Sequence, residues 1–129
     1  MVFTQAELDY LASQRLGRLA TVAPDGQPQN NPVGYFVDAE TGTITIGGYA
    51  LGTTKKFRNI QKGSAVALVV DDIASVNPWV VRGIEIRGTA EALTDVDPPV
   101  PTMSREIIRI TPRRIISWGL GEPSSRRDV

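Results

Sequence analysis

The first stretch of the chain has apolar residues at helical spacing. Thr4 and Glu7 are placed as the two partners of a capping box, which starts a helix by satisfying free backbone N–H groups. Apolar residues then recur on a single face over the next two turns, at Leu8, Leu11 and Ala12. The pattern predicts a helix over about Gln5–Gln14 that lays this face on the strands that follow it.

From residue 18 onward the spacing of apolar residues falls to two, which is typical of β-strands. Turn-forming residues separate the alternating segments, which cover residues 18–22, 27–37, 43–46, 65–70, 79–93, 106–111 and 114–118. Short turns join the first three segments, so we expect an antiparallel meander there. Pro28 and Pro32 interrupt the second segment and cannot donate a ladder hydrogen bond, so this strand must lie at an edge or carry a bulge.

Two later segments indicate how the sheet is shaped. Residues 65–70 are continuously apolar, which predicts a strand buried on both faces, and residues 71–78 are expected to form a loop. The segment 79–93 is long, and Gly83 and Gly88 would let it coil, as a strand does when a small sheet closes into a barrel. We therefore predict a mainly β protein, an antiparallel barrel of Greek-key type with two short helices. The polar tail, residues 122–129, is expected to be mobile.

Composition narrows the chemistry that this barrel could perform. The 129 residues are expected to form one domain, residues 1–129. The chain has no cysteine and no histidine, which excludes thiolate nucleophiles, Ser-His-Asp triads and His- or Cys-ligated metals. Its 14 basic and 14 acidic residues balance, which argues against nucleic acid as a partner. No apolar run approaches the roughly 20 residues of a membrane span, and the N-terminus does not resemble a signal peptide, so we expect a cytoplasmic protein without a membrane partner.

The most informative segment for function is residues 47–59. Glycines at its start would let the backbone approach a ligand closely. A short helix is predicted over about Thr54–Gln61, where the Thr54 hydroxyl can cap the helix and free N–H groups can bind an anion. Four basic residues and no acid lie between Lys55 and Lys62. The segment is typical of a phosphate site, and a solvated basic helix face is the alternative reading.

Four motifs in order resemble one family. They are residues 17–33, residues 54–69, residues 82–91 and residues 112–119, and together they span about Phe3 to Leu120. This arrangement is similar to the pyridoxamine 5′-phosphate oxidase-like split β-barrel proteins. Within that family the chain resembles the actinobacterial subgroup that uses the deazaflavin coenzyme F420 in place of FMN.

The resemblance implies a split β-barrel that forms a homodimer, with the cofactor in a groove between the subunits. It implies that the cofactor is bound by Asn31, Pro32, Val33, Thr45, Ile46, Gly47, Gly48, Tyr49, Ala50, Thr54, Lys55, Lys56, Arg58, Trp79 and Arg82. The last two would come from the long strand of this chain or of its partner. It names no catalytic residue and no metal. Packing is an equal alternative for Trp79, and a core or interface position is favoured for Trp118.

Two departures from the family bear on the cofactor and on the substrate. Members that use FMN usually place a basic residue in the strand that ends here at Gly47–Gly48, and this chain has none. The Arg and His residues that bind pyridoxal phosphate are also missing, which argues against pyridoxamine phosphate oxidation. We therefore expect an F420-dependent oxidoreductase that transfers hydride to or from a small conjugated organic substrate. An FMN-dependent enzyme of the same fold and a non-catalytic F420- or flavin-binding protein remain as alternatives.

Overall fold

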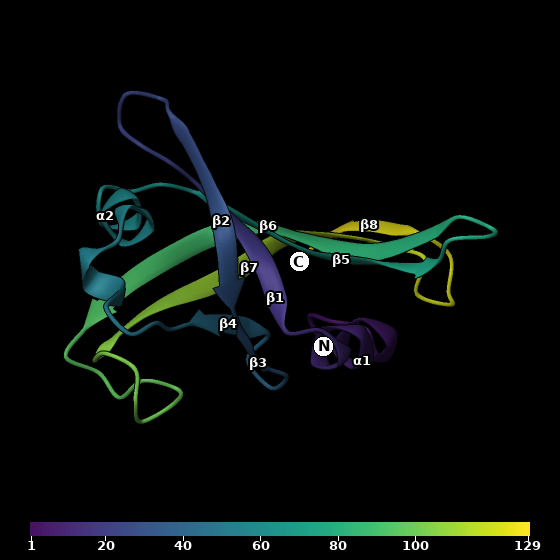
Figure 1. The fold of residues 1–129 in the computed structure, drawn as a ribbon, viewed down its shortest axis with the longest axis horizontal. Coiled ribbons are helices and arrows are strands. Elements are labelled where there is room, and N and C mark those ends of the chain that lie inside the picture. Colours follow the sequence, from purple (N-terminus) through teal and green to yellow (C-terminus); the bar gives the residue numbers. More distant parts are fainter.

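Eight antiparallel strands form one strongly curved sheet in the computed structural model, which describes residues 1–129 (Figure 1). The strands are β1 Leu16–Val22, β2 Pro28–Gly34, β3 Phe36–Asp38, β4 Thr43–Ile46, β5 Val66–Ser75, β6 Val80–Thr94, β7 Glu106–Trp118 and β8 Ser125–Asp128. Their order is β2-β1-β5-β6-β7-β4-β3, and β8 pairs with the second half of β7. This is the predicted mainly β, antiparallel split barrel.

The sheet closes on itself at Tyr35. Strands β2 and β3 lie at opposite ends of the strand order, yet only Tyr35 separates them in the chain. The Tyr35 hydroxyl donates to the carbonyl oxygen of Leu11 at 2.6 Å, which ties this corner to the first helix. The expected single strand over residues 27–37 is therefore divided in two. Both pairings of the expected meander form, β1 with β2 and β3 with β4. The break at Tyr35 places these two pairs at opposite ends of the strand order, and β4 also pairs with β7.

The prolines of β2 behave as predicted. Pro28 and Pro32 pair in register with Val22 and Arg18 of β1, and no strand lies on the other side of β2. An edge strand tolerates residues that cannot donate to a ladder. The edge position follows from sequence chemistry alone.

The long strands differ from the prediction at two places. Strand β5 continues through Asp71 and Asp72 to Ser75, so most of the expected loop over residues 71–78 is strand. Strand β7 runs unbroken through Pro112, where a register shift opposite Gly88 forms a bulge. A Cβ at Gly88 would clash with the backbone of Thr111, so only glycine fits this bulge.

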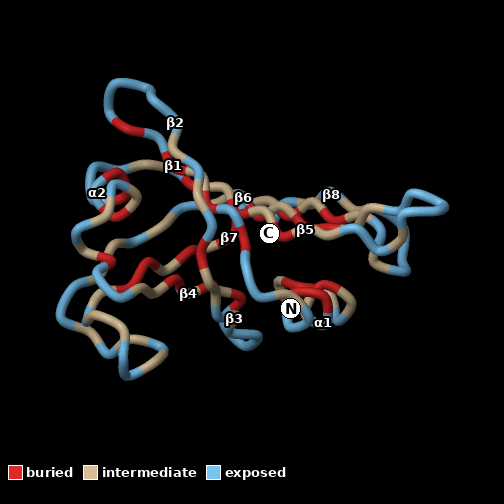
Figure 2. The backbone as a smooth tube through the Cα atoms, viewed as in Figure 1, coloured by how far each residue is buried: buried red, intermediate tan, exposed pale blue.

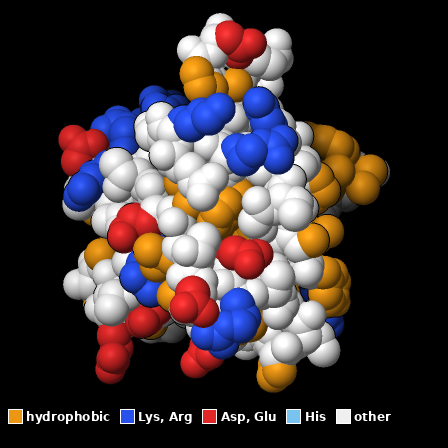
Figure 3. All heavy atoms as spheres, turned by 90° about the vertical axis from the view of Figure 1, so that its left-hand side faces the viewer, with side chains coloured by type: hydrophobic (Ala, Val, Ile, Leu, Met, Phe, Trp, Pro, Cys, Tyr) orange, Lys and Arg blue, Asp and Glu red, His pale blue; other side chains and the backbone are white.

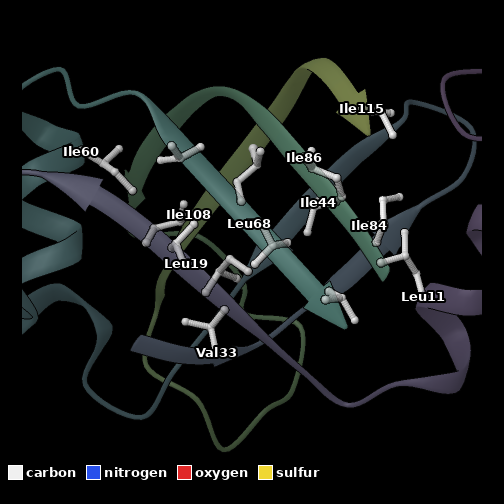
Figure 4. Packing of buried hydrophobic residues seen from close by; sticks show 14 of the residues in the cluster. Leu11, Leu19, Val33, Ile44, Ile60, Leu68, Ile84, Ile86, Ile108 and Ile115 are labelled. Carbon is white, nitrogen blue, oxygen red and sulfur yellow. The ribbon is translucent and has the colours of Figure 1, made fainter. Parts of the chain in front are cut away.

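The core lies inside the curve of the sheet (Figures 2 and 4). Alternate residues of the strands fill it and are fully buried, among them Leu19, Ile44, Ile46, Leu68, Ile84, Ile86, Ile108 and Ile110. Strand β5 is buried on this face only. On its outer face Ala67 and Val69 are half-buried and Ala65 is exposed, so the expected burial on both faces is not found within one chain.

Two helices cover the barrel. Helix α1, Gln5–Ser13, begins with the predicted capping box, in which Thr4 N donates to Glu7 Oε1 at 2.9 Å. It buries Tyr10 and Leu11, whereas Ala12 is exposed rather than on the buried face. Helix α2, Lys55–Gln61, packs on β1 and β6. No helix has both the length and the apolar character that crossing a membrane requires.

The end of the chain departs from the expected mobile tail. Ser125–Asp128 forms β8 on the edge of β7, and Arg127 reaches the first helix. There the Arg127 guanidinium donates to both carboxylate oxygens of Glu7, a residue with 0% exposure. A long-range ion pair thus orders a segment whose own composition is polar.

Candidate functional site

The glycine-rich segment after β4 is held in place by the start of β7. The Ser104 backbone N–H and hydroxyl both donate to the carbonyl oxygen of Gly48, at 2.9 and 3.0 Å. Leu51 N donates to Ser104 Oγ at 3.1 Å, and Gly52 N donates to Glu106 Oε1 at 2.9 Å. These contacts lead the chain through a short 3-10 helix, Leu51–Thr53, into α2. The sequence analysis did not identify Ser104 or Glu106. The only sequence feature that could have indicated them is the spacing of two polar residues, two positions apart, at the start of an apolar strand.

Between this segment and β2 lies a concavity of about 470 Å³, here called the site hollow. The structure brings eight of the predicted cofactor residues to its wall: Pro32, Val33, Gly47, Gly48, Tyr49, Ala50, Thr54 and Lys56. Met103 also lines the hollow and was not predicted. The hydroxyls of Thr53 and Thr54 and the amine of Lys56 make the wall polar near α2. Pro32, Val33 and Met103 form the apolar part of the wall.

The start of α2 carries positive charge that nothing in the chain neutralises. Thr54 caps the helix through Phe57 N at 3.4 Å, as predicted, and the N–H groups of Lys55 and Lys56 have no acceptor in the chain. None of the basic residues over 55–62 forms an ion pair. Figure 3 shows basic side chains gathered on part of this end of the molecule.

Lys56 differs from its basic neighbours in its burial. It is half-buried and faces the site hollow, whereas Lys55 and Arg58 are exposed, and Arg58 donates to the carbonyl oxygen of Thr53 at 3.0 Å. Burial lowers the pKa of the Lys56 amine, because the charged form loses hydration without gaining an acidic partner. An anionic ligand in the site hollow would supply that partner.

Asn31 presents an unpaired acceptor on the same face of β2 as Val33. Its Oδ1 is buried and has no hydrogen-bond donor. A buried acceptor without a donor costs about 1–3 kcal/mol. This oxygen is closed off within the chain, and Asn31 does not line the site hollow. Asn59 Oδ1, on the buried side of α2, is the other such atom, although the Asn59 Nδ2 donates to Thr21 Oγ1 at 3.0 Å.

Two predicted residues of β4 point away from the site hollow. Ile46 has 0% exposure and belongs to the core. Thr45 faces the outside of the sheet, where it lines a second concavity of about 300 Å³, here called the outer hollow, together with Phe36 and Arg109. Side-chain alternation along a strand explains why a run of neighbouring residues could not all line one site.

Trp79 and Arg82 also lie outside the site hollow within one chain. Trp79 is 64% exposed in the β5–β6 turn, which projects at the opposite end of the molecule from α2 (Figure 1). The Arg82 guanidinium pairs with Asp72, with Nε–Oδ1 at 2.8 Å, and lies 5.1 Å from the ring centre of Tyr10. Trp118 is half-buried and packs closely on Gly83.

Residues 3–119 match the model of the pyridoxamine 5′-phosphate oxidase family. The chain belongs to this family. A 5a,11a-dehydrotetracycline/5a,11a-dehydrooxytetracycline reductase from Streptomyces rimosus is 50% identical over 121 residues, which are 93% of this chain and 85% of that protein. The chain is thus an oxidoreductase of the pyridoxamine 5′-phosphate oxidase-like fold, and this fold binds cofactors of the flavin or F420 type.

Solved structures agree on the fold. A conserved hypothetical protein from Mycobacterium tuberculosis superposes with a TM-score of 0.71 at 25% identity, covering 94% of this chain and 89% of that one. General stress protein 26 from Bacillus anthracis superposes with a TM-score of 0.70 at 17% identity, covering 97% of both chains. At 17% identity, the likeness to general stress protein 26 concerns the fold alone.

Proposed function

We propose that the protein is an F420-dependent reductase that transfers hydride to a conjugated double bond in a fused-ring organic substrate. The observation that carries this proposal is the site hollow, which joins an apolar wall to a basic, unneutralised helix start. The substrate class follows from the reductase of Streptomyces rimosus, whose substrates are dehydrotetracyclines.

The residues present suit a phosphorylated flavin-like cofactor. Lys55 and Lys56 offer two free backbone N–H groups and two amines to a phosphate. The Thr54 hydroxyl donates to the carbonyl oxygen of Leu51 at 2.7 Å and so fixes the helix start that presents them. Gly48 leaves the backbone open to close approach, since a Cβ there would meet its nearest atom only at 3.7 Å.

The chain itself supplies orientation and electrostatics rather than a proton-transfer group. A reduced deazaflavin, when bound, supplies the hydride from its own ring. No acidic side chain lines the site hollow, and nearby Glu106 is engaged by Gly52 N. In this proposal Lys55 and Lys56 hold the anionic end, while Pro32 and Val33 exclude water from the apolar end.

The alternative cofactor is FMN. Strand β4 ends at Gly47–Gly48 without the basic residue that FMN-dependent members usually have there, which favours F420. A second alternative is a protein that binds the cofactor without catalysis.

We also propose that the protein is a homodimer. The outer faces of β1 and β5 carry Ala20, Ala67 and Val69, and next to them lies a largely apolar hollow of about 420 Å³. A second copy on this face would explain why β5 is apolar on both sides although one chain covers only one. Trp79 and Arg82 would then reach a cofactor only from the partner subunit.

Titration of the purified protein with F420 and with FMN tests the proposal. We expect saturable F420 binding at micromolar concentration and NAD(P)H-independent reduction of a dehydrotetracycline by reduced F420. Tighter binding of FMN would favour the flavin enzyme. Binding of F420 without turnover of enones, quinones or dehydrotetracyclines would favour the non-catalytic protein, and binding of neither cofactor would reject the proposal.

A further inference from the structure

One lysine of the chain lines a concavity, while the others stand in solvent. The chain has three lysines, and Lys55 and Lys62 are exposed, whereas Lys56 is half-buried and lines the site hollow. The only other amine, at the N-terminus, belongs to Met1, which is 88% exposed. Lys56 is therefore the one lysine that the fold partly withdraws from water.

No acidic side chain balances the amine of Lys56. Among the side chains that line the site hollow, only those of Tyr49 and Lys56 are ionisable. Glu106, beside the glycine-rich segment, accepts from Gly52 N at 2.9 Å and forms no ion pair. Burial lowers the pKa of the Lys56 amine, because the charged form loses hydration and gains no counter-charge. At neutral pH this amine is therefore unprotonated more often than an ordinary lysine amine, which titrates at about pH 10.4.

An amine in this setting is a nucleophile. Lysines that lose hydration in an apolar pocket readily form imines with carbonyl compounds, because the unprotonated amine is the reactive form. The chain has no cysteine, so no thiol competes for an electrophile. Pro32, Val33 and Met103 provide an apolar wall in the same hollow, whose volume of about 470 Å³ lies in the range of small-molecule sites. A small aromatic aldehyde matches both features, since its ring suits the wall and its carbonyl carbon suits the amine.

We propose that Lys56 is a covalent modification site, at which an aromatic aldehyde held against the apolar wall of the site hollow forms an imine. Lys56 Nζ adds to the carbonyl carbon, so that a C–N bond forms and the electron pair of the C=O double bond moves to the oxygen, which takes up a proton. The nitrogen then gives up its protons and the oxygen leaves as water. Amine and aldehyde thus give imine and water, and no oxidant or reductant is consumed.

The aldehyde and the proposed cofactor compete for the same hollow. In the proposed function the apolar wall holds the cofactor ring and Lys56 holds its phosphate, so imine formation belongs to the cofactor-free protein. Bound cofactor covers the amine and protects the site from reactive aldehydes. The reactivity of Lys56 itself does not depend on the proposed function, and only this protection rests on it.

Reductive trapping followed by peptide mass spectrometry tests the proposal without turnover. The cofactor-free protein is incubated with 2-hydroxybenzaldehyde at about pH 8, where ordinary lysine amines remain mostly protonated. Cyanoborohydride then reduces the imine to a stable secondary amine, and peptide mapping locates it. Lys56 should be labelled at least about threefold faster than Lys55 or Lys62, because more of its amine is unprotonated and the bound ring holds the carbonyl group near it. Equal labelling of the three lysines would overturn the proposal.

A second aldehyde and a matched pair of variants separate the hollow from the amine. Acetaldehyde has no ring, so its preference for Lys56 should be weaker than that of 2-hydroxybenzaldehyde, and an equal preference would overturn the role of the apolar wall. Lys56→Arg keeps the positive charge and should abolish the fast phase of labelling, whereas Lys55→Arg, at the exposed neighbouring residue, should leave it unchanged. A fast phase that persists in Lys56→Arg would assign the reaction to another amine. Thermal unfolding checks that both variants are folded.

Labelling in the presence of F420 separates this inference from the proposed function. Saturating F420 should slow the labelling of Lys56 and leave that of Lys62 unchanged, because Lys62 does not line the site hollow. Binding of F420 without protection would refute the cofactor position given in the proposed function and the protection inferred from it. If the protein binds neither F420 nor FMN, the proposed function fails, while the labelling of the cofactor-free protein still decides whether Lys56 is the nucleophile.

Discussion

Replacing both Lys55 and Lys56 with alanine should weaken cofactor binding strongly and leave the fold almost unchanged. Neither amine forms an ion pair, so the folded chain loses no internal contact. Both residues lie in the first turn of α2, where a positive charge opposes the helix dipole unless an anion is present. The two amines are therefore expected to serve binding rather than stability.

The magnitude follows from their different exposure. A charge-assisted hydrogen bond contributes about 1.5–3 kcal/mol. Lys56 is half-buried and should contribute near the upper value, whereas Lys55 is exposed and its contribution is reduced by solvent screening. Together they should contribute about 2–4 kcal/mol, which corresponds to a loss of roughly 30- to 1000-fold in affinity.

Fluorescence titration with F420 at low and high salt provides the assay. The matched control is Lys62→Ala, because Lys62 lies at the other end of α2 and does not line the site hollow. The control should bind within about twofold of wild type, and raising the salt concentration should weaken wild-type binding more than that of the double variant. If the double variant binds F420 as tightly as the wild type, the phosphate is held elsewhere and the reasoning is refuted.

Four further predictions concern stability and assembly. Arg127→Ala leaves the buried carboxylate of Glu7 without its partner, so it should lower the free energy of unfolding in urea titration by about 3 kcal/mol. The control is Arg126→Ala at the exposed neighbouring residue, which should change the free energy of unfolding by less than about 0.5 kcal/mol. Burial opposes ionisation of Glu7, but hydrogen bonds from Arg127 and Thr4 outweigh it and hold the pKa of Glu7 below the ordinary 4.5. The stability that Glu7 contributes should therefore be fully present above about pH 4.5 and fall as the pH drops through the folded pKa. Glu7→Gln should reduce this pH dependence in acid unfolding. Ser104→Ala removes the hydrogen bonds of the hydroxyl with Gly48 O and Leu51 N, while the backbone bond from Ser104 N to Gly48 O remains. It should cost about 1–2 kcal/mol in thermal unfolding and weaken F420 binding, and normal binding would show that the hydroxyl does not shape the site. Ala67→Asp should convert the proposed dimer to a monomer in sedimentation velocity. The control is Ala12→Asp, on the exposed surface of α1. A monomeric wild type would contradict the proposed dimer.

Features that depend on neighbouring residues could be predicted from the sequence. The capping box of Thr4 and Glu7, the edge position imposed by Pro28 and Pro32, and the cap that Thr54 places on α2 are all found in the structure. Each is decided by the chemistry of residues a few positions apart. The same holds for the clustering of Gly47, Gly48, Thr54 and Lys56, which one continuous segment brings together.

Features that depend on distant residues could not be predicted. The division of residues 27–37 at Tyr35 follows from the closure of the sheet, and the order of the tail follows from Arg127 meeting Glu7 across 120 positions. Thr45 lines the outer hollow rather than the site hollow, because side chains alternate along β4 and only the tertiary pairing shows which face is inside.

The candidate site also combines features set by neighbouring residues with features set by distant ones. Sequence alone determined the basic, glycine-rich segment and its chemistry, since helix capping, backbone freedom and charge are properties of a short stretch of chain. Tertiary structure decided that Ser104 and Glu106 hold that segment, that Met103 lines the same hollow, and that Trp79 and Arg82 lie away from it. The physical reason is that a concavity is formed by strands that meet only when the sheet curls, and the energy of curling comes from burial summed over the whole core.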